Sequence, residues 1–149
     1  MGFQAEGLRQ GPQKISREFL RRAMQARTIL ESRALSFGPD KALHLSMDDI
    51  ELLMPYEECA DGVREGTVRD IALITRVGRP VCFIVTQVPE EGPVLVSRAL
   101  AQQQCKADYL DTLFPGDTLP CRVTHIEPFG AFCDVGCGIS ALLPIDCMS

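Results

Sequence analysis

The period of the hydrophobic residues changes near residue 28 and divides the chain into a helical segment and a series of short strands. Between Lys14 and Arg27, apolar residues recur at helical spacing with arginines between them, which predicts an amphipathic helix with a basic outer face. The residues that follow form alternating or short apolar runs bounded by proline and glycine, as antiparallel strands do. The predicted strands are 28–37, 42–47, 50–54, 80–88 and 94–96.

A second group of elements follows these strands. Residues 97–106 are rich in Ala, Gln and Leu and predict a connecting helix, and strand patterns return at 118–126, 131–135 and 139–143. Five short strands separated by turns favour a small barrel over a sandwich. The predicted fold class is therefore mainly β with helices, built from OB-fold-type five-stranded antiparallel barrels that follow the N-terminal amphipathic helix.

An internal repeat indicates that the chain contains two copies of this barrel. At an offset of 89 residues, identical or chemically similar residues align without a gap, and the order of strands and turns agrees throughout. The aligned residues are Leu30 with Leu119, Arg33 with Arg122, Pro39 with Pro128, Ile50 with Ile139, Leu53 with Leu142, Pro55 with Pro144, and Glu57 with Asp146. Counterparts of the last two strands would lie beyond Ser149, so the second barrel is expected to be incomplete.

The charge of the chain is unevenly distributed. The net charge is −5, unlike that of a globally basic nucleic-acid-binding protein, yet residues 1–40 carry seven basic groups against four acidic ones. Distant charges are screened beyond about 10 Å, so a local basic surface can still bind phosphates on an acidic protein. The basic face of the N-terminal helix is interpreted either as an ordinary solvated surface or as a contact to RNA or the ribosome.

The seven cysteines, without an apolar leader segment, favour reduced thiols and a cytoplasmic location. No apolar run approaches the length of a membrane span. Cys121, Cys133, Cys137 and Cys147 lie close together in the sequence, but only Cys133 and Cys137 are spaced as in a zinc knuckle. Packing as small buried hydrophobic residues is the preferred interpretation, with metal binding or redox chemistry as the alternative.

The most informative segment is residues 115–136. It begins with a Gly-Asp pair, continues through a valine-containing strand and ends with Phe-Gly-Ala-Phe at 129–132 and an aspartate two residues later. This order resembles the opening of the S1 domain, an RNA-binding barrel named after a protein of the bacterial small ribosomal subunit. In the first copy, residues 52–58, 77–85 and 94–99 resemble the later strands of that family. The arrangement is similar to that of short S1-like proteins of Gram-positive anaerobes.

The resemblance implies a site for single-stranded RNA on the second barrel. Aromatic rings on the open face of such a barrel stack on unpaired bases. Phe129 and Phe132 are the candidate stacking residues, and Gly130 between them would permit a bulge that turns both rings to one face. Arg122 and His125 on the preceding strand are candidates to contact phosphate or base. The alternative is that both phenylalanines belong to the core.

The first copy departs from this arrangement. The offset places Asp40 opposite Phe129 and Leu43 opposite Phe132, so the first barrel is expected to be structural or to contact protein. Pro144 stands where the family often has a histidine on the RNA face, and proline offers no hydrogen-bond donor there.

The resemblance extends over about residues 28–149 and implies four segments. They are an irregular lead and basic helix (1–27), a degenerate S1-like barrel (28–98), a linker helix (99–112) and the first three strands of a second, truncated S1-like domain (113–149).

These features predict a protein that binds single-stranded messenger RNA in translation, with the small ribosomal subunit as a further partner. The sequence contains no phosphate-binding glycine loop, dinucleotide fingerprint or nucleophile elbow, and His44 and His125 are not paired with a nucleophile. No catalytic residue, cofactor, metal, membrane or small-molecule substrate is expected. Two rival hypotheses stay open: a degenerate S1-like module that binds protein through its acidic surface, and a thiol-based metal or redox protein.

Overall fold

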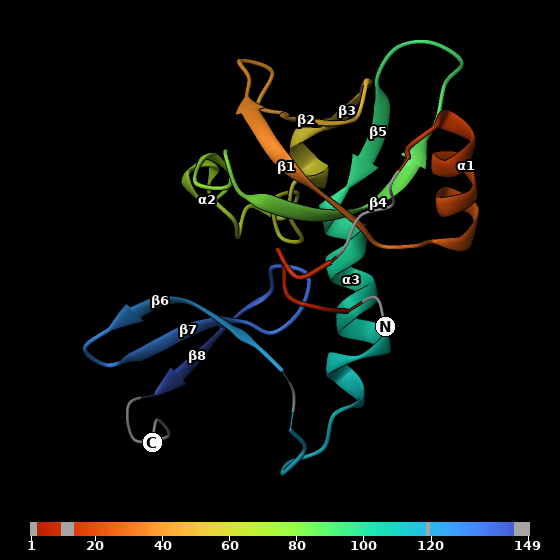
Figure 1. Ribbon diagram of the computed structural model, residues 1–149. Coiled ribbons are helices and arrows are strands. Elements are labelled where there is room, and N and C mark those ends of the chain that lie inside the picture. Colours follow the sequence, from red (N-terminus) through yellow and green to blue (C-terminus); the bar gives the residue numbers. More distant parts are fainter. Residues whose placement is uncertain (1–2, 10–13, 119, 145–149) are drawn as a thin grey trace.

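The computed structural model describes residues 3–9, 14–118 and 120–144 and contains a closed five-stranded barrel and a separate three-stranded sheet (Figure 1). The barrel strands are β1 (Leu30–Phe37), β2 (Leu43–Met47), β3 (Ile50–Met54), β4 (Pro80–Gln87) and β5 (Val94–Ser97). The sheet consists of β6 (Arg122–Glu127), β7 (Gly130–Asp134) and β8 (Ser140–Pro144). The helices are α1 (Arg17–Ala26), η1 (Tyr56–Glu58), α2 (Asp70–Ile74), α3 (Arg98–Asp108) and η2 (Leu110–Thr112). The short helices η1, α2 and η2 were not predicted.

The barrel closes in the order β1-β2-β3-β5-β4, which is compatible with an OB-type barrel. All neighbouring strands are antiparallel except β3 and β5, which run parallel. The prediction of a wholly antiparallel barrel was wrong on this point. A closed ring with an odd number of strands cannot reverse direction at every step, so at least one neighbouring pair must be parallel.

Strand β4 is buried on both of its faces. Val81, Phe83 and Val85 point into the barrel core, where they pack with apolar residues of the other strands and of α1. Cys82 and Ile84 point outward into a second apolar cluster that includes residues of α3. Because residues 81–85 of β4 are buried on both faces, they form a continuous apolar run, as expected for a strand covered on both sides, whereas Thr86 and Gln87 at its end are exposed.

Helix α3 is a packed element rather than a simple linker. Ser97 caps its first turn, where Oγ accepts a hydrogen bond from Leu100 N at 3.0 Å. Ala101 and Cys105 are fully buried in the cluster against β4. The helix therefore joins the barrel to the segment that leads to β6 (Figure 1).

The basic residues of α1 are mostly used within the protein. Arg17 donates two hydrogen bonds of 2.7 Å to the carbonyl oxygens of Pro89 and Gly92 in the loop between β4 and β5. Arg21 pairs with Glu90 of the same loop at 3.6 Å. These contacts tie the helix to the barrel, a role that neither sequence interpretation of the basic face, as solvated surface or as RNA contact, included.

The two copies of the repeat share a local irregularity. In the pairing of β1 with β2, the register shifts between Ala34 and Ser36, and in the pairing of β6 with β7 it shifts between Val123 and His125, 89 residues further on. Both copies therefore place a bulge at the same point of their first strand. Two aligned residues, Leu119 and Asp146, lie outside the described residues.

Most strand boundaries were predicted to within one or two residues, but β6 begins at Arg122, four residues after the predicted start. In the described part of the chain, no helix has the length and apolar character that crossing a membrane requires.

Candidate nucleic-acid interface

Three of the four predicted RNA-binding side chains lie together on the β6–β8 sheet. His125 is paired with Phe132 across β6 and β7, so the two side chains share a face. Their ring centroids are 6.4 Å apart, with an angle of 27° between the planes. Phe129, in the turn before β7, meets the edge of Phe132 at 6.2 Å with perpendicular planes. We call His125, Phe129 and Phe132 the aromatic platform.

The aromatic platform belongs to the surface and not to the core. Phe129 is 55% exposed, and Leu142, which pairs with Phe132 from β8, is 48% exposed. Neither Phe129 nor Phe132 belongs to the two buried apolar clusters of the described residues. The alternative prediction, that both phenylalanines are core residues, was therefore wrong.

His125 has an acidic neighbour within the sheet. Its Nε2 is within hydrogen-bond distance of the carboxylate of Glu127, two residues along β6. This contact holds the imidazole against the ring of Phe132, and it places a negative charge where a phosphate would otherwise approach. His125 is therefore better suited to ring stacking than to phosphate binding.

Gly130 has a different role from the one predicted, because the register shift in this sheet lies in β6 and not at Gly130. A Cβ atom at Gly130 would lie 2.3 Å from the carbonyl oxygen of Leu143, which is backbone of the adjacent strand β8. Glycine is thus required by the close approach of β7 and β8 beneath the platform.

Gly130→Ala is expected to lower the free energy of unfolding by about 1–3 kcal/mol, because the clash is with backbone that cannot rotate away. Chemical denaturation of the variant and the original protein measures this. Ser140→Ala, at the exposed end of β8, is the control and should change stability by less than about 0.5 kcal/mol. Unchanged stability in Gly130→Ala would show that β8 moves freely relative to β7.

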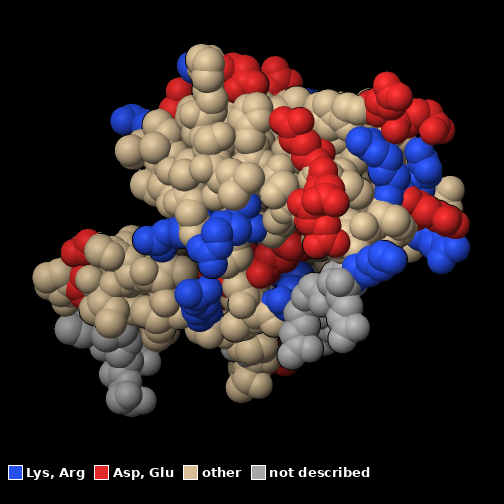
Figure 2. Space-filling view, turned by 45° about the horizontal axis from the view of Figure 1, so that its top comes forward, with Lys and Arg blue, Asp and Glu red and all other residues tan. Residues whose placement is uncertain are grey.

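Arg122, the fourth predicted residue, lies at the other end of β6, at the junction between the sheet and the barrel. Its Nη1 donates a hydrogen bond of 2.9 Å to the carbonyl oxygen of Glu6. Figure 2 shows basic side chains gathered in the hollow between the barrel and the sheet. Arg122 is paired with Asp134 in the register of β6 and β7, so it shares the face of the platform without touching its rings.

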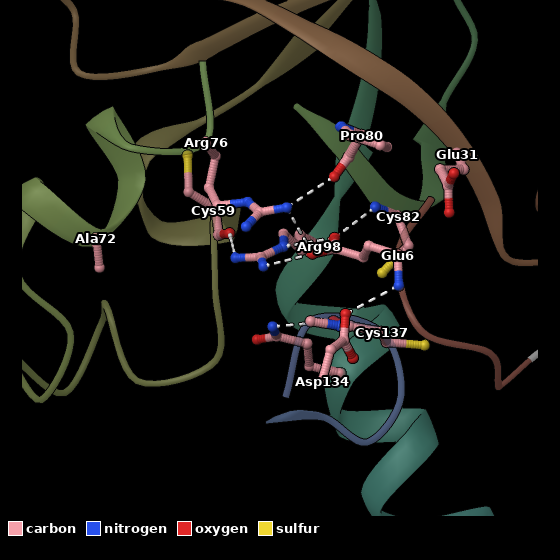
Figure 3. A network of polar contacts seen from close by, with 12 residues as sticks. Glu6, Glu31, Cys59, Ala72, Arg76, Pro80, Cys82, Arg98, Asp134 and Cys137 are labelled. Atoms are coloured by element: carbon pink, nitrogen blue, oxygen red, sulfur yellow. Dashed lines mark hydrogen bonds and ion pairs between the residues drawn. The ribbon is translucent and has the colours of Figure 1, made fainter. Parts of the chain in front are cut away.

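A buried ion cluster holds the N-terminal segment in this junction (Figure 3). The carboxylate of Glu6 pairs with Arg98 of α3, with Oε1 2.8 Å from Nη2 and Oε2 3.0 Å from Nε. It also accepts a hydrogen bond of 2.7 Å from Cys82 N and lies 3.3 Å from Nη2 of Arg76. The side chains of Glu6 and Arg98 are only 2% and 6% exposed. Glu6 thereby links the N-terminal segment to β4, to α3 and to the loop after α2.

Asp134 completes the link from Glu6 to the second sheet. Its Oδ2 accepts a hydrogen bond from Glu6 N at 2.9 Å, and its Oδ1 accepts from Gly136 N and Gly138 N in the turn before β8. The backbone of residues 4–6 therefore bridges the barrel and the β6–β8 sheet, because Cys137 N also donates to Gln4 O at 2.9 Å.

The buried carboxylates at this junction have shifted pKa values of opposite sign. Burial alone would raise the pKa of Glu6, but the charges of Arg98 and Arg76 and the hydrogen bonds from Arg98 and Cys82 outweigh it, so the pKa is lowered. Burial raises the pKa of Asp134, and its backbone hydrogen bonds only partly offset this effect. Burial alone would lower the pKa of Arg98, but the charge of Glu6 and its hydrogen bonds with Arg98 outweigh burial, so the pKa of Arg98 is raised.

The structure groups the cysteines differently from the sequence. Cys137 lies with Cys82 of β4 and Cys105 of α3 in the second apolar cluster. Hydrogen bonds from Cys105 and Cys82 lower the pKa of the Cys137 thiol, against the effect of burial. Arg9 Nη2 lies 3.4 Å from Cys137 Sγ and adds to this shift. No signal in the C-terminal cysteine spacing pointed to this cluster.

The remaining C-terminal cysteines fit the packing prediction only in part. Cys133 is buried as predicted, but Cys121 is exposed, and Cys147 lies outside the described residues. In the described part of the chain, no three His, Cys, Asp or Glu side chains are arranged to hold a metal ion.

The first copy of the repeat carries no comparable platform. Ser36 pairs with His44 at the position where His125 pairs with Phe132, so the counterpart of Phe132 is His44. The alignment of Leu43 with Phe132 was wrong by one residue, because the hairpin of the second copy is one residue shorter. His44 is instead engaged with Asp40, with Nε2 3.2 Å from Oδ2.

Comparison with known protein families finds no match to this chain, and a search of curated proteins finds no similar sequence.

Sequence reasoning missed the residues that build the junction, above all Glu6, Arg76, Arg79 and Arg98. Glu6 and Arg98 are separated by 92 residues and belong to no common motif or period. The alignment of Arg33 with Arg122 in the repeat was the one sequence signal that bears on this region.

Proposed function

We propose that this protein binds single-stranded RNA without strong sequence preference. The observation that carries the proposal is the aromatic platform, in which His125 and Phe129 are exposed and Phe132 is half-buried, and which shares one sheet face with Arg122. Aromatic rings that adjoin one another at the surface form an apolar patch of the kind that marks binding sites. An unpaired base is a suitable partner for such a patch, because its flat face stacks on the ring.

The roles of the four residues follow from their positions. Phe129 and Phe132 stack bases, and the imidazole of His125 extends the surface of Phe132. Arg122 lies at the end of β6 away from the aromatic turn, and its guanidinium binds the phosphate backbone as the strand leaves the platform. The resemblance of residues 115–136 to the S1 domain and the OB-compatible barrel support this proposal, and they suggest messenger RNA in translation as the ligand.

The double variant Phe129→Ala with Phe132→Ala tests the platform directly. Stacking contributes about 1–3 kcal/mol per base, so the loss of two stacked bases is expected to lower the affinity for a short labelled single-stranded RNA by about 30-fold or more. Fluorescence anisotropy measures the affinity, and circular dichroism measures whether the fold is kept.

Phe114→Ala is the matched control. Phe114 is 75% exposed and is not part of the platform, so its removal should leave RNA affinity unchanged. Equal affinity in the double variant and the original protein would reject the platform as the site. If the original protein binds no RNA at low salt, the protein-interaction hypothesis replaces the present proposal.

A further inference from the structure

A cleft lined by arginines lies between the barrel and the β6–β8 sheet. Its volume is about 420 Å³, and it is bordered by the N-terminal segment, β1, the loop before β4, and β6. Four arginines line it, namely Arg33, Arg76, Arg79 and Arg122, and two carboxylates line it, those of Glu6 and Asp134. We call this site the arginine cleft; it occupies the hollow with the basic side chains in Figure 2.

The positive charge of the arginine cleft is not neutralised by its own carboxylates. Glu6 is buried and already shared between Arg98 and Arg76, and Asp134 is buried and holds three backbone amides. Within the described part of the chain, Arg33, Arg79 and Arg122 form no ion pair with a carboxylate.

Two of these arginines are held in place by backbone oxygens. Arg33 Nη1 donates to the carbonyl of Gly78, and Arg122 Nη1 donates to the carbonyl of Glu6. Carbonyl oxygens orient a guanidinium without removing its charge, and they leave its other N–H groups available. Three exposed cations around one concave surface, two of them oriented in this way, attract an anion with several charges.

The repeat explains how the cations come to surround one cleft. Arg33 in β1 and Arg122 in β6 are aligned at the offset of 89 residues, and both line the cleft. Each copy of the repeat therefore presents the same position of its first strand to the junction. The N-terminal segment at Glu6 and Gly7 lies between them as part of the cleft wall.

The arginine cleft is adjacent to the aromatic platform. Arg122 lines the cleft and belongs to the same strand and the same sheet face as His125. An RNA strand whose bases stack on Phe129 and Phe132 would continue along this sheet face to Arg122 and then into the arginine cleft.

We propose that the arginine cleft binds consecutive phosphates of the single RNA strand whose bases occupy the aromatic platform. Arg33 and Arg79, together with Arg122, contact the phosphates, while Arg76 stays paired with Glu6 at the base of the cleft. This inference rests on the proposed function, and it assigns the backbone contacts to a junction formed by both copies of the repeat. Either copy alone would lack half of the site.

The double variant Arg33→Gln with Arg79→Gln tests the cleft in the full chain. The affinity for a labelled single-stranded RNA is measured by anisotropy over a range of salt concentrations. Each phosphate contact to a single strand contributes about 0.7 to the slope of log affinity against log salt, so losing two should make the slope shallower by about 1.4. The original protein should therefore lose its advantage as salt rises: the ratio of its affinity to that of the variant should fall by about 25-fold for each tenfold increase in salt concentration.

Arg22→Gln with Arg27→Gln is the matched control, because it removes the same charge from α1 and its C-terminus. It should leave the slope unchanged. Phe129→Ala with Phe132→Ala should lower the affinity but keep the slope. An unchanged slope in the Arg33 and Arg79 variant, with RNA still bound by the original protein, would overturn the cleft and leave the platform intact. A slope equally reduced in the α1 control would also overturn it, since the effect would then reflect net charge.

A labelled oligonucleotide made of abasic sites identifies the group that the cleft recognises. It carries the phosphates without the bases, so it should bind weakly and lose this binding in the Arg33 and Arg79 variant, while the platform variant should leave it unchanged. Inorganic polyphosphate is then added as a competitor, alongside unlabelled RNA of equal charge. If polyphosphate competes as well as the RNA does, the RNA strand is not the specific ligand and the cleft is a site for free polyphosphate.

Discussion

Glu6→Gln is expected to lower the free energy of unfolding by about 3–5 kcal/mol, because it leaves the buried guanidinium of Arg98 without its counter-charge. The Glu6 and Arg98 side chains are 2% and 6% exposed, so water cannot replace the lost carboxylate. Glutamine keeps the size of the side chain, so the effect isolates the charge from packing. Denaturation by urea, followed by circular dichroism, measures the change.

The control is Glu18→Gln, which removes a carboxylate paired with Arg22 on the exposed side of α1. The Glu18 and Arg22 side chains are 71% and 76% exposed, so the expected change is at most about 0.5 kcal/mol. A similar small loss in Glu6→Gln would mean that the N-terminal segment does not contribute to the stability of the junction.

The same carboxylate gives stability a dependence on pH. The folded state lowers the pKa of Glu6 below its ordinary value of 4.5, so its stabilisation is complete above that value and is lost as the pH falls through the folded pKa. Asp134 acts in the opposite sense, because burial raises its pKa and protonation therefore favours the folded state. Glu6→Gln should remove the first contribution, so its stability should fall less steeply than that of the original protein as the pH is lowered below 4.5.

Phe83→Ala is expected to lower the free energy of unfolding by about 3–5 kcal/mol while leaving the RNA-binding residues in place. Phe83 is completely buried in the barrel core, between Val81 and Val85 on the inner face of β4. Its removal opens a cavity that the closed barrel cannot collapse to fill, because its strands are hydrogen-bonded on both sides. Denaturation by urea measures the loss.

Phe114→Ala again serves as the control, since the same atoms are removed from a side chain that is 75% exposed. The expected change there is within about 0.5 kcal/mol. Together with Phe129→Ala and Phe132→Ala, these variants separate the two uses of phenylalanine in this protein. A buried ring supports the fold, and an exposed ring on the platform is expected to support binding. A Phe83→Ala protein as stable as Phe114→Ala would contradict the closed barrel core.

The strands and the platform were predictable because they depend on local pattern. Successive side chains of a pleated strand point to opposite faces, so the alternating Val81, Phe83 and Val85 predicted that one face of β4 points into the core. The Phe-Gly-Ala-Phe sequence identified a hairpin with two aromatic rings, and the structure keeps these rings together on one surface. The sequence also drew attention to Gly130. The reason that glycine is needed there is the close approach of the β8 backbone, which the sequence pattern does not show.

The internal repeat also allowed a prediction about residues far apart in the sequence. The offset of 89 residues predicted that Arg33 and Arg122 occupy equivalent positions, and the register shifts at Ala34 and Val123 agree with this equivalence. The offset did not hold in the second strand, because the first hairpin of the second copy is one residue shorter, so that Phe132 corresponds to His44. It holds again in the third strand, where Leu142 corresponds to Leu53. Turn length, and not side-chain pattern, fixes register at that point.

By itself, then, the sequence determined the order of the strands, which depends on neighbours within a few residues, and the equivalence of Arg33 and Arg122, which follows from the repeat. Only the tertiary structure decided the parallel pairing of β3 with β5, the burial of Glu6 against Arg98, and the meeting of Arg33 and Arg79 with Arg122 in one cleft. The physical reason is that charge pairing and burial act between groups close in space, and these groups, far apart in the sequence, are close only in the folded chain. An apparently irregular N-terminal lead thereby becomes the segment that joins the two halves of the protein.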